Sequence, residues 1–231
     1  MTQEQTLEKM NRMRLYGMAH AFSRFLEAGF SQNFTADELI AHLVDSEWEE
    51  RYNRKLSQLL AKATFRHQSS FEQIDFNTKR NLDKNILLRL SNGEWIKKGE
   101  NILITGPTGV GKSFLACALG HQACLDGFKV LYSSGMKLFS KLKYAKADGS
   151  YAKELKRIKN QNLLILDDFG LHPMDEESKF MLLELLEDRY GDRATLITSQ
   201  LPLGHWHEFI ASPTVADAIC DRLIHNAYKI E

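Results

Sequence analysis

The stretch from residue 101 to residue 113, Asn-Ile-Leu-Ile-Thr-Gly-Pro-Thr-Gly-Val-Gly-Lys-Ser, constrains the fold of this chain more than any other. An apolar run leads into a glycine-rich segment, and Lys112-Ser113 then opens an apolar pattern with helical spacing. Gly106 and Gly111 enclose four residues in the spacing G-x-x-x-x-G-K-[ST], in which backbone N–H groups surround a phosphate without interference from Cβ atoms. The order strand, loop, helix therefore predicts a phosphate-binding loop.

The loop predicts a nucleoside triphosphate and Mg²⁺ as ligands. Lys112 would reach the β- and γ-phosphates, and the Ser113 hydroxyl would complete the shell of the metal ion. The helix that follows presents unpaired N–H groups and its positive dipole end to the same anion. The residues expected to contact the nucleotide are Gly106, Pro107, Thr108, Gly109, Val110, Gly111, Lys112, Ser113 and Phe114. A glycine-rich turn that binds nothing is the alternative, and the full match with its flanking strand and helix argues against it.

Two carboxylates follow a short apolar run at residues 163–166, which is typical of a buried parallel strand. Ligands of open α/β sheets bind at the carboxyl ends of the strands. Asp167 would therefore face Mg²⁺, directly or through water, and Asp168 would orient or deprotonate the attacking water. Either aspartate could instead cap the following turn.

Two further residues are candidates for the triphosphate site. Gln200 ends a strand in Thr-Ser-Gln and could contact the γ-phosphate or the water, or it could be an ordinary strand terminus. Arg222 lies in an apolar helical segment, where it could pair with Asp217 or Asp221, or reach the γ-phosphate of a neighbouring subunit. The residues alone leave both alternatives open.

Alternating apolar runs and helical patterns after residue 69 predict an α/β fold with a parallel sheet covered on both faces. The expected strands lie near residues 102–104, 127–132, 163–166, 194–198 and 227–230. A helix is predicted over residues 79–90. The apolar cluster at residues 71–76 either closes the edge of the domain or lies beside the adenine base.

The first part of the chain predicts two helices. Apolar residues at three- and four-residue steps predict a helix over 5–28 that Gly29 ends. Thr35 and Glu38 form a capping box for a second helix that runs to about Thr64. Two helices bury too little surface to form a core alone. We therefore expect residues 1–68 to be a module for partner binding or oligomerisation, followed by a nucleotide-binding domain at 69–231.

The net charge is zero, with 30 basic and 30 acidic residues, but the charge is segregated along the chain. Residues 51–66 hold five basic residues and no acidic one, and residues 137–159 hold eight basic residues against two acidic ones. Basic stretches contact nucleic-acid phosphates without reading sequence, and a solvated helix face is the alternative. The candidate DNA contacts are Arg51, Arg54, Lys55, Lys137, Lys141, Lys143, Lys146, Lys153, Lys156 and Arg157.

Three cysteines in apolar contexts, without metal-ligand spacing, are expected to be reduced, which fits a cytosolic protein. Charged residues interrupt the first 18 positions, so a secretory segment is not predicted there. The apolar runs fall short of the ~20 residues that span a bilayer, so we expect no membrane partner.

Five motifs together resemble the IstB family, the ATP-binding helpers of insertion-sequence transposases. They are the phosphate loop, Leu-Leu-Ile-Leu-Asp-Asp-Phe-Gly at 163–170, Thr-Ser-Gln-Leu-Pro at 198–202, Trp-His at 206–207, and residues 216–225. The resemblance covers essentially the whole chain. It implies a P-loop AAA+ domain of the initiator clade, related to the DnaC helicase loader, with a five-stranded parallel sheet between helices and a helical N-terminal module.

The resemblance also implies roles for single residues. Lys112, Ser113 and Asp167 match the nucleotide and Mg²⁺ positions, and Gln200 matches the first sensor. Asp168 stands where many AAA+ proteins have glutamate, so slow hydrolysis is expected. Arg222 matches an arginine finger supplied in trans. Residues 137–159 match a helical insertion that faces DNA. The family usually continues past the last strand into a segment with a further sensor arginine, so we expect the natural protein to extend beyond Glu231.

The expected function is that of an ATPase of the bacterial cytoplasm that uses ATP and Mg²⁺. It would assemble into homo-oligomers on duplex DNA, with little sequence preference, and regulate a cognate transposase. The first alternative is a DnaC-like loader that acts on single-stranded DNA and a replicative helicase. A metabolic P-loop kinase is a further alternative, which would have an acceptor pocket and no use for Arg222.

Overall fold

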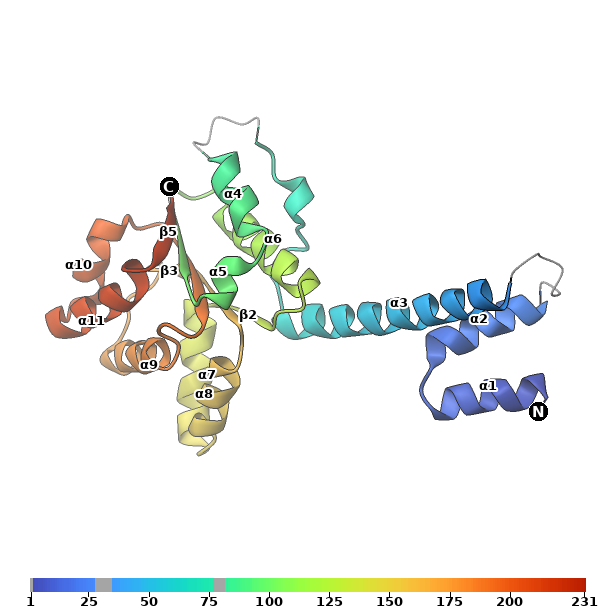
Figure 1. Cartoon of the computed structure of the whole chain (residues 1–231). Coiled ribbons are helices and arrows are strands. Elements are labelled where there is room, and N and C mark those ends of the chain that lie inside the picture. The colour runs from blue at the N-terminus through green and yellow to red at the C-terminus, as the bar shows by residue number, and fades with distance from the viewer. Residues whose placement is uncertain (1, 28–34, 77–81) are drawn as a thin grey trace. The chain divides into compact units, whose positions relative to one another are not determined.

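The computed structural model describes residues 2–27, 35–76 and 82–231. The chain divides into two compact units, Met1–Gln58 and Leu59–Glu231. Figure 1 shows the helices and strands of each unit. The boundary between the two units follows residue 58 and therefore lies before the predicted boundary at residue 68. The residues that follow the long helix of the first unit therefore belong with the nucleotide-binding domain.

The first unit contains helices α1 (Gln3–Arg12), α2 (Tyr16–Glu27) and most of α3 (Ala36–Ala63). The prediction of one helix over 5–28 is wrong, because the chain breaks between α1 and α2. Arg14 adopts the left-handed conformation with φ 60°. Its N–H donates to Asn11 O at 3.0 Å and the N–H of Leu15 donates to Met10 O at 2.8 Å, which closes the helix in a Schellman motif. The apolar spacing continues across this break and therefore conceals it. Residues 28 and 29, where that helix is expected to end, lie outside the described residues.

The predicted start of α3 is confirmed. The N–H of Thr35 donates to Glu38 Oε2 at 2.8 Å, and the N–H of Glu38 donates to Thr35 Oγ1 at 3.3 Å, which together form the capping box. This exchange satisfies N–H groups that the first turn of a helix cannot pair internally.

Helices α2 and α3 are joined by a buried carboxylate. Glu47 Oε2 accepts hydrogen bonds from the N–H groups of Gly17 at 2.8 Å and Met18 at 3.2 Å, in the first turn of α2. Arg51, one turn further along α3, donates to the other oxygen of Glu47 at 2.6 Å. Gly17 is itself required, because a Cβ there would lie 2.2 Å from Ser46 O.

The second unit contains a five-stranded sheet in the order β2-β3-β4-β1-β5, in which every neighbouring pair is parallel. Its strands are β1 (Asn101–Thr105), β2 (Val130–Ser134), β3 (Leu163–Phe169), β4 (Ala194–Ser199) and β5 (Ala227–Ile230). Its helices are η1 (Phe71–Gln73), α4 (Lys84–Leu90), α5 (Glu94–Lys97), α6 (Lys112–Leu125), α7 (Gly135–Ala147), α8 (Tyr151–Lys159), α9 (Glu176–Glu187), η2 (Leu203–His205), α10 (Trp206–Ile210) and α11 (Pro213–Ile224). The predicted parallel α/β sheet is confirmed.

The strand order decides which helix covers which face. Parallel crossovers are right-handed, so the step from β1 to β2 and the steps from β2 to β3, β3 to β4 and β4 to β5 place their helices on opposite faces. Helix α6 covers one face, and α7, α9 and α11 cover the other (Figure 1). The apolar side chains of β3, α7, α9 and α11 form a common buried core on that second face.

The start of one helix and the end of one strand differ from expectation. Helix α4 begins at Lys84, after Asp83 caps its first turn by accepting from the N–H of Asn85 at 2.8 Å. The predicted start of that helix, at residues 79–81, lies outside the described residues. Strand β3 continues to Phe169 and thereby includes both aspartates of the predicted site.

The thiols and the apolar character of the helices bear on redox state and membrane spanning. Cys117, Cys124 and Cys220 are free thiols, and burial raises the pKa of Cys124 to about 12, so this thiol stays protonated. Within the residues that the structure describes, no helix is both long and apolar enough to cross a membrane.

Gly17→Ala is expected to destabilise the first unit by about 1–3 kcal/mol, because the new methyl group collides with the backbone of α3. Hydrogen exchange should show faster exchange in α2 and α3, with α6 unchanged. Gly204→Ala is the matched control, since a Cβ there meets no atom within 4 Å. Wild-type protection of α2 in the Gly17 variant would contradict this packing.

Candidate nucleotide site

The loop between β1 and α6 has a backbone that only glycine adopts readily. Gly106, Gly109 and Gly111 have φ values of 146°, 85° and 97°, all in the region that disfavours a Cβ. The ammonium group of Lys112 lies inside this loop and donates to the carbonyl oxygens of Gly106 and Pro107, both at 2.8 Å. The sequence pattern therefore produces the turn and lysine position that a phosphate-binding loop needs.

Asp167, at the end of β3, is fully buried and accepts hydrogen bonds from three hydroxyl groups. Ser113 Oγ donates to Oδ1 at 2.9 Å, Tyr132 Oη donates to Oδ2 at 2.5 Å, and Thr198 Oγ1 also donates to Oδ1. A buried carboxylate is costly unless such donors compensate for lost water. Asp167 therefore joins β3 to α6, β2 and β4.

Burial and charge alter two titratable groups at this site. Burial raises the pKa of the Tyr132 phenol, and its hydrogen bond to Asp167 raises it further, so the hydroxyl remains a donor. Burial lowers the pKa of the Lys112 ammonium, while the charges of Asp168 and Asp167 oppose that change.

The oxygen atoms beside the loop fit a divalent cation of the hard class. Mg²⁺ takes oxygen ligands, and at triphosphate sites it uses one or two protein groups together with phosphates and water. Ser113 Oγ and Asp167 Oδ1 lie 2.9 Å apart and offer a hydroxyl and a carboxylate. In the described part of the chain, no group of three or more His, Cys, Asp or Glu could hold a metal alone. A cation here would therefore depend on phosphate oxygens.

Asp168 occupies the next position in a strained backbone. Its φ is 57°, in the left-handed region that non-glycine residues avoid, and its N–H donates to Thr198 Oγ1 at 3.0 Å. Its carboxylate pairs with Arg66, whose Nη1 lies 3.2 Å from Asp168 Oδ2 and 3.9 Å from Asp167 Oδ2. The strained turn points the two aspartates in different directions, one into the protein and one toward solvent.

Gln200 also lies at the phosphate loop, since Thr108 Oγ1 donates to its Oε1 at 2.9 Å. The strand that precedes Gln200 is the neighbour of β1, with Thr105 and Ser199 in register at the carboxyl ends of both strands. The structure thus brings together Lys112, Ser113, Asp167, Asp168 and Gln200.

An apolar cavity of about 290 Å³ adjoins the loop on the side of β5. Its walls include Ile74 from the segment after η1, Val110 from the loop, Phe114 from α6 and Ile230 from β5. The predicted apolar cluster at residues 71–76 therefore contributes to a cavity beside the phosphate loop. A flat apolar base would fit such a space.

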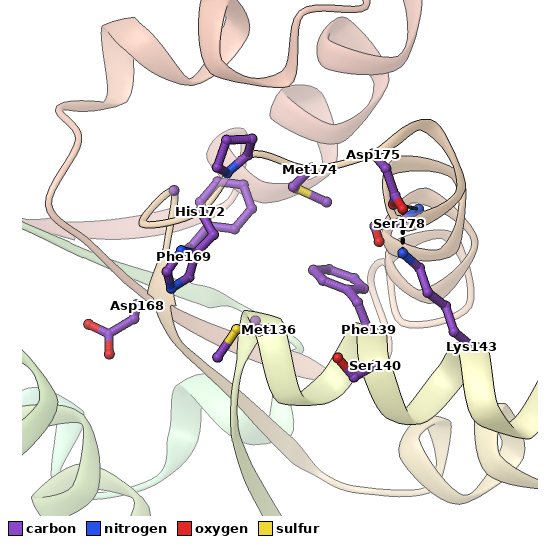
Figure 2. Close-up of a pocket in the computed structure, with 13 residues that line it drawn as sticks. Met136, Phe139, Ser140, Lys143, Asp168, Phe169, His172, Met174, Asp175 and Ser178 are labelled. Atoms are coloured by element: carbon purple, nitrogen blue, oxygen red, sulfur yellow. Dashed lines mark hydrogen bonds and ion pairs between the residues drawn. The ribbon is translucent and has the colours of Figure 1, made fainter.

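A second cavity, of about 200 Å³, lies between α7, α9 and the segment after β3. Figure 2 shows Asp168 at one end of it, with the carboxylate directed away from Phe139 and Met174. At the other end Lys143 pairs with Asp175. The hydrogen bond from Lys143 lowers the pKa of the Asp175 carboxyl well below its usual value, and burial raises that pKa only slightly.

Comparison with known proteins adds the family. The model of the family described as IstB-like ATP binding protein matches residues 8–231. The chain belongs to this family. An insertion-sequence ATP-binding protein of Sinorhizobium fredii (strain NBRC 101917 / NGR234) is 49% identical over 226 residues, which cover 98% of this chain and 92% of the relative. The IS1162 ATP-binding protein of Pseudomonas fluorescens is 39% identical over 203 residues, which cover 87% and 88%.

Solved structures share the fold of this IstB-like chain. DnaI matches with a TM-score of 0.58 and 24% identity, over 71% of this chain and 90% of DnaI. AMPPCP-bound DnaA from Aquifex aeolicus matches with a TM-score of 0.59 and 20% identity, over 73% of this chain and 51% of DnaA. The predicted resemblance to the IstB family and the predicted P-loop AAA+ fold are confirmed.

Arg222 of this IstB-like chain lies at the opposite edge of the sheet from the phosphate loop. Its carbonyl oxygen accepts from Asn101 Nδ2 at 3.0 Å, and Asn101 begins β1, whereas the phosphate loop follows the end of β1. At about 3.3 Å per residue, the strand separates the two by roughly 16 Å. The guanidinium pairs with Glu187 of α9 rather than with Asp217 or Asp221, the two partners that the sequence suggests.

The basic residues of α7 and α8 are largely paired with carboxylates of the same unit. The ion pairs join Lys141 and Arg157 to Glu154, Lys143 to Asp175, and Lys146 to Glu177. Lys137, Lys153 and Lys156 are exposed, and no ion pair involves them within the described ranges. On α3, Arg51 and Arg54 pair with Glu47 and Glu50, as their four-residue spacing favours, and Lys55 is exposed.

Sequence reasoning missed two residues of the site, Tyr132 and Arg66. Tyr132 has the pattern of an ordinary apolar residue of β2, and only the adjacency of β2 and β3 brings its hydroxyl to Asp167. Arg66 belongs in sequence to a basic stretch that extends back along α3. An arginine just outside a helix end is a weak signal, and its partner lies 102 residues further along the chain.

Tyr132→Phe is expected to raise, by about tenfold, the Mg²⁺ concentration at which a fluorescent ATP analogue binds half-maximally. The variant keeps the ring but removes a donor that orients Asp167, and outer hydrogen-bond partners of metal ligands affect affinity by about this factor. Binding of the analogue in EDTA should be unchanged. Tyr144→Phe, on the exposed side of α7, is the control. An equal Mg²⁺ requirement in both variants would contradict the role of Tyr132.

Proposed function

We propose that this protein is an ATPase that assembles on duplex DNA, binds Mg²⁺ and ATP between its subunits, and regulates the transposase of an insertion sequence. The family and the relatives' names support the ATP-binding and insertion-sequence parts of this function. Hydrolysis, assembly, DNA binding and transposase regulation are the proposal.

The separation of Arg222 from the phosphate loop is the observation that supports assembly most directly. Arg222 lies at the end of the sheet where the strands begin, so it can reach a γ-phosphate only if a second copy places its phosphate loop there. The Arg222 side chain is 22% exposed and its guanidinium pairs with the half-exposed Glu187, so a phosphate from a second copy would have to displace that carboxylate. An arginine supplied in trans stabilises the charge of the transition state.

The chain's own residues divide the work of hydrolysis. Lys112 and the loop N–H groups bind the β- and γ-phosphates, and Ser113 and Asp167 would hold Mg²⁺, which neutralises developing charge on the phosphates when bound. Asp168 and Gln200 orient the attacking water at the solvent side of the loop. The Asp168 side chain is one methylene shorter than glutamate, so slow turnover is expected.

The apolar cavity beside Val110 and Phe114 is proposed to receive the adenine base. DNA binding is proposed for the three exposed lysines of α7 and α8 that form no ion pair with described residues, Lys137, Lys153 and Lys156, since their charges are not neutralised by neighbours. Lysine contacts to phosphates release counterions and carry no sequence information.

A mixture of Arg222→Ala and Lys112→Ala proteins is expected to recover ATPase activity that neither variant has alone. In a mixed oligomer, an intact phosphate loop can face an intact finger. Steady-state phosphate release at increasing ratios of the two proteins measures this recovery. An inactive mixture, formed from variants that still co-assemble by mass photometry, would contradict a site shared between subunits.

The triple change of Lys137, Lys153 and Lys156 to Ala is expected to weaken duplex-DNA binding. The slope of log Kd against log salt should fall by about one for each DNA phosphate that the variant no longer neutralises. Exposed lysines elsewhere in the same unit, Lys98, Lys129 and Lys229, give the matched triple control. Fluorescence anisotropy with two unrelated duplexes also tests sequence preference. Unchanged affinity and slope would argue that DNA does not bind to α7 and α8.

Capture experiments separate the transposase from the helicase as partner. The protein should retain a cognate transposase in the presence of ATP. Retention of a replicative helicase alone would favour the loader function, since the chain also shares its fold with the DnaC helicase loader.

A further inference from the structure

Arg66 is the cation that faces the two aspartates of the nucleotide site. Its Nη1 lies 3.2 Å from Asp168 Oδ2 and 3.9 Å from Asp167 Oδ2. The arginine side chain is 57% exposed and that of Asp168 is 25% exposed. Exposed ion pairs of this kind contribute little to stability. The pair is therefore better suited to orienting a carboxylate than to holding the fold together.

The segment that carries Arg66, residues 63–70, is fixed against the ATP-binding domain on both sides of the arginine. The Phe65 ring packs edge-on against Tyr132, with centroids 6.2 Å apart, and a Cβ at Gly120 would lie 2.6 Å from it. On the other side, Ser69 Oγ donates to Phe114 O at 3.2 Å. Both contacts reach α6, the helix that follows the phosphate loop, and the first also reaches β2.

Strained backbone brackets the pair. Thr64 has φ 57° and its hydroxyl donates to Tyr132 O at 3.3 Å, which turns the chain out of α3 toward the site. Asp168 has the same unusual φ. Non-glycine residues keep such conformations only where the surrounding structure imposes them, and these positions concentrate at functional sites. One such residue, Thr64, lies two positions before Arg66, and the other is Asp168 itself, so strained backbone adjoins both members of the ion pair.

The Asp168 side chain is oriented so that its carboxylate can pair with Arg66. In Figure 2 the carboxylate is directed away from the cavity between α7 and α9, and no hydrogen bond to it comes from that cavity among the described residues. Lys112 is a further charged neighbour of Asp168 among the described residues, and its ammonium donates to loop carbonyls.

We propose that Arg66 is a positioning residue that holds the Asp168 carboxylate toward the attacking water. This inference rests on the proposed ATPase function, because it assigns Arg66 to the same reaction. Arg66 acts through Asp168, and its charge also competes with a cation for the oxygens of Asp167. The segment that ends α3 thereby forms part of the hydrolytic site.

Arg66→Gln is expected to lower kcat for ATP about tenfold, since small displacements of catalytic groups have effects of this size or larger. It should also lower the Mg²⁺ concentration for half-maximal binding of a fluorescent ATP analogue about twofold to threefold. Arg66→Lys, which keeps the charge, should restore the Mg²⁺ requirement and part of kcat. Arg89→Gln, on the exposed side of α4, is the matched control.

A double-mutant cycle with Asp168→Asn tests whether Arg66 acts through Asp168. Adding Arg66→Gln to Asp168→Asn should lower kcat no further, because the group that Arg66 orients has already lost its function. A further tenfold loss in that background would overturn the proposal, as would wild-type kcat and Mg²⁺ requirement in Arg66→Gln. Loss of hydrogen-exchange protection in α6 of Arg66→Gln without rescue by Arg66→Lys would also overturn it, in favour of a structural role.

The two readouts distinguish this inference from the proposed function. A wild-type protein that binds ATP but does not hydrolyse it, with or without DNA, refutes the ATPase and with it the role of Arg66 in hydrolysis. Turnover in the wild type with no change in Arg66→Gln refutes the role of Arg66 alone.

Discussion

The buried carboxylate of Asp167 is the interaction on which the nucleotide site depends. An ionised group without solvent must be compensated by donors, and here they come from α6, β2 and β4 around the end of β3. Of these elements, α6 follows the phosphate loop directly, and β4 pairs with β1, the strand that precedes the loop. Satisfying one carboxylate therefore fixes the relative position of the loop, the second aspartate and the glutamine of the neighbouring strand.

The parallel sheet imposes a second constraint, because all of its strands begin at one end of the sheet and finish at the other. All strands end on the side of the phosphate loop, so the start of β1 and the end of α9 lie on the opposite side. Arg222 belongs to that opposite edge. In the proposed assembly, the phosphate loop at one end of the sheet would face Arg222 at the other end of the sheet of a second copy.

Electrostatic pairing in space changes the meaning of charge along the chain. The basic run over residues 137–159 and the acidic run after residue 167 are separate in sequence, but the fold packs α7 beside α9, and Tyr151 of α8 donates to Glu184 of α9. Ion pairs then join them, as between Lys146 and Glu177. The lysines that these pairs leave exposed, Lys137, Lys153 and Lys156, are the ones proposed to contact DNA.

The sequence by itself determined the features that local backbone chemistry encodes. The glycines and lysine of the loop, the capping box of Thr35, the i, i+4 pairs of α3 and the apolar runs of the buried strands depend on neighbours a few residues away. The same runs, alternating with helical patterns, were enough to predict the parallel sheet, and the AAA+ assignment came from the resemblance of five motifs to the IstB family. Asp167, Asp168 and Gln200 were identifiable because each ends such a run.

Only the tertiary structure decided which distant residues meet. The helix break at Arg14 closes through backbone hydrogen bonds that an amphipathic pattern does not reveal. Tyr132 and Arg66 reach the aspartates because strand order places β2 beside β3 and because residues 63–70 pack on the domain. Glu187 rather than a nearby aspartate pairs with Arg222 for the same reason. The sequence gives the chemistry of each side chain directly, but which distant residue that side chain contacts depends on how the strands and helices are arranged.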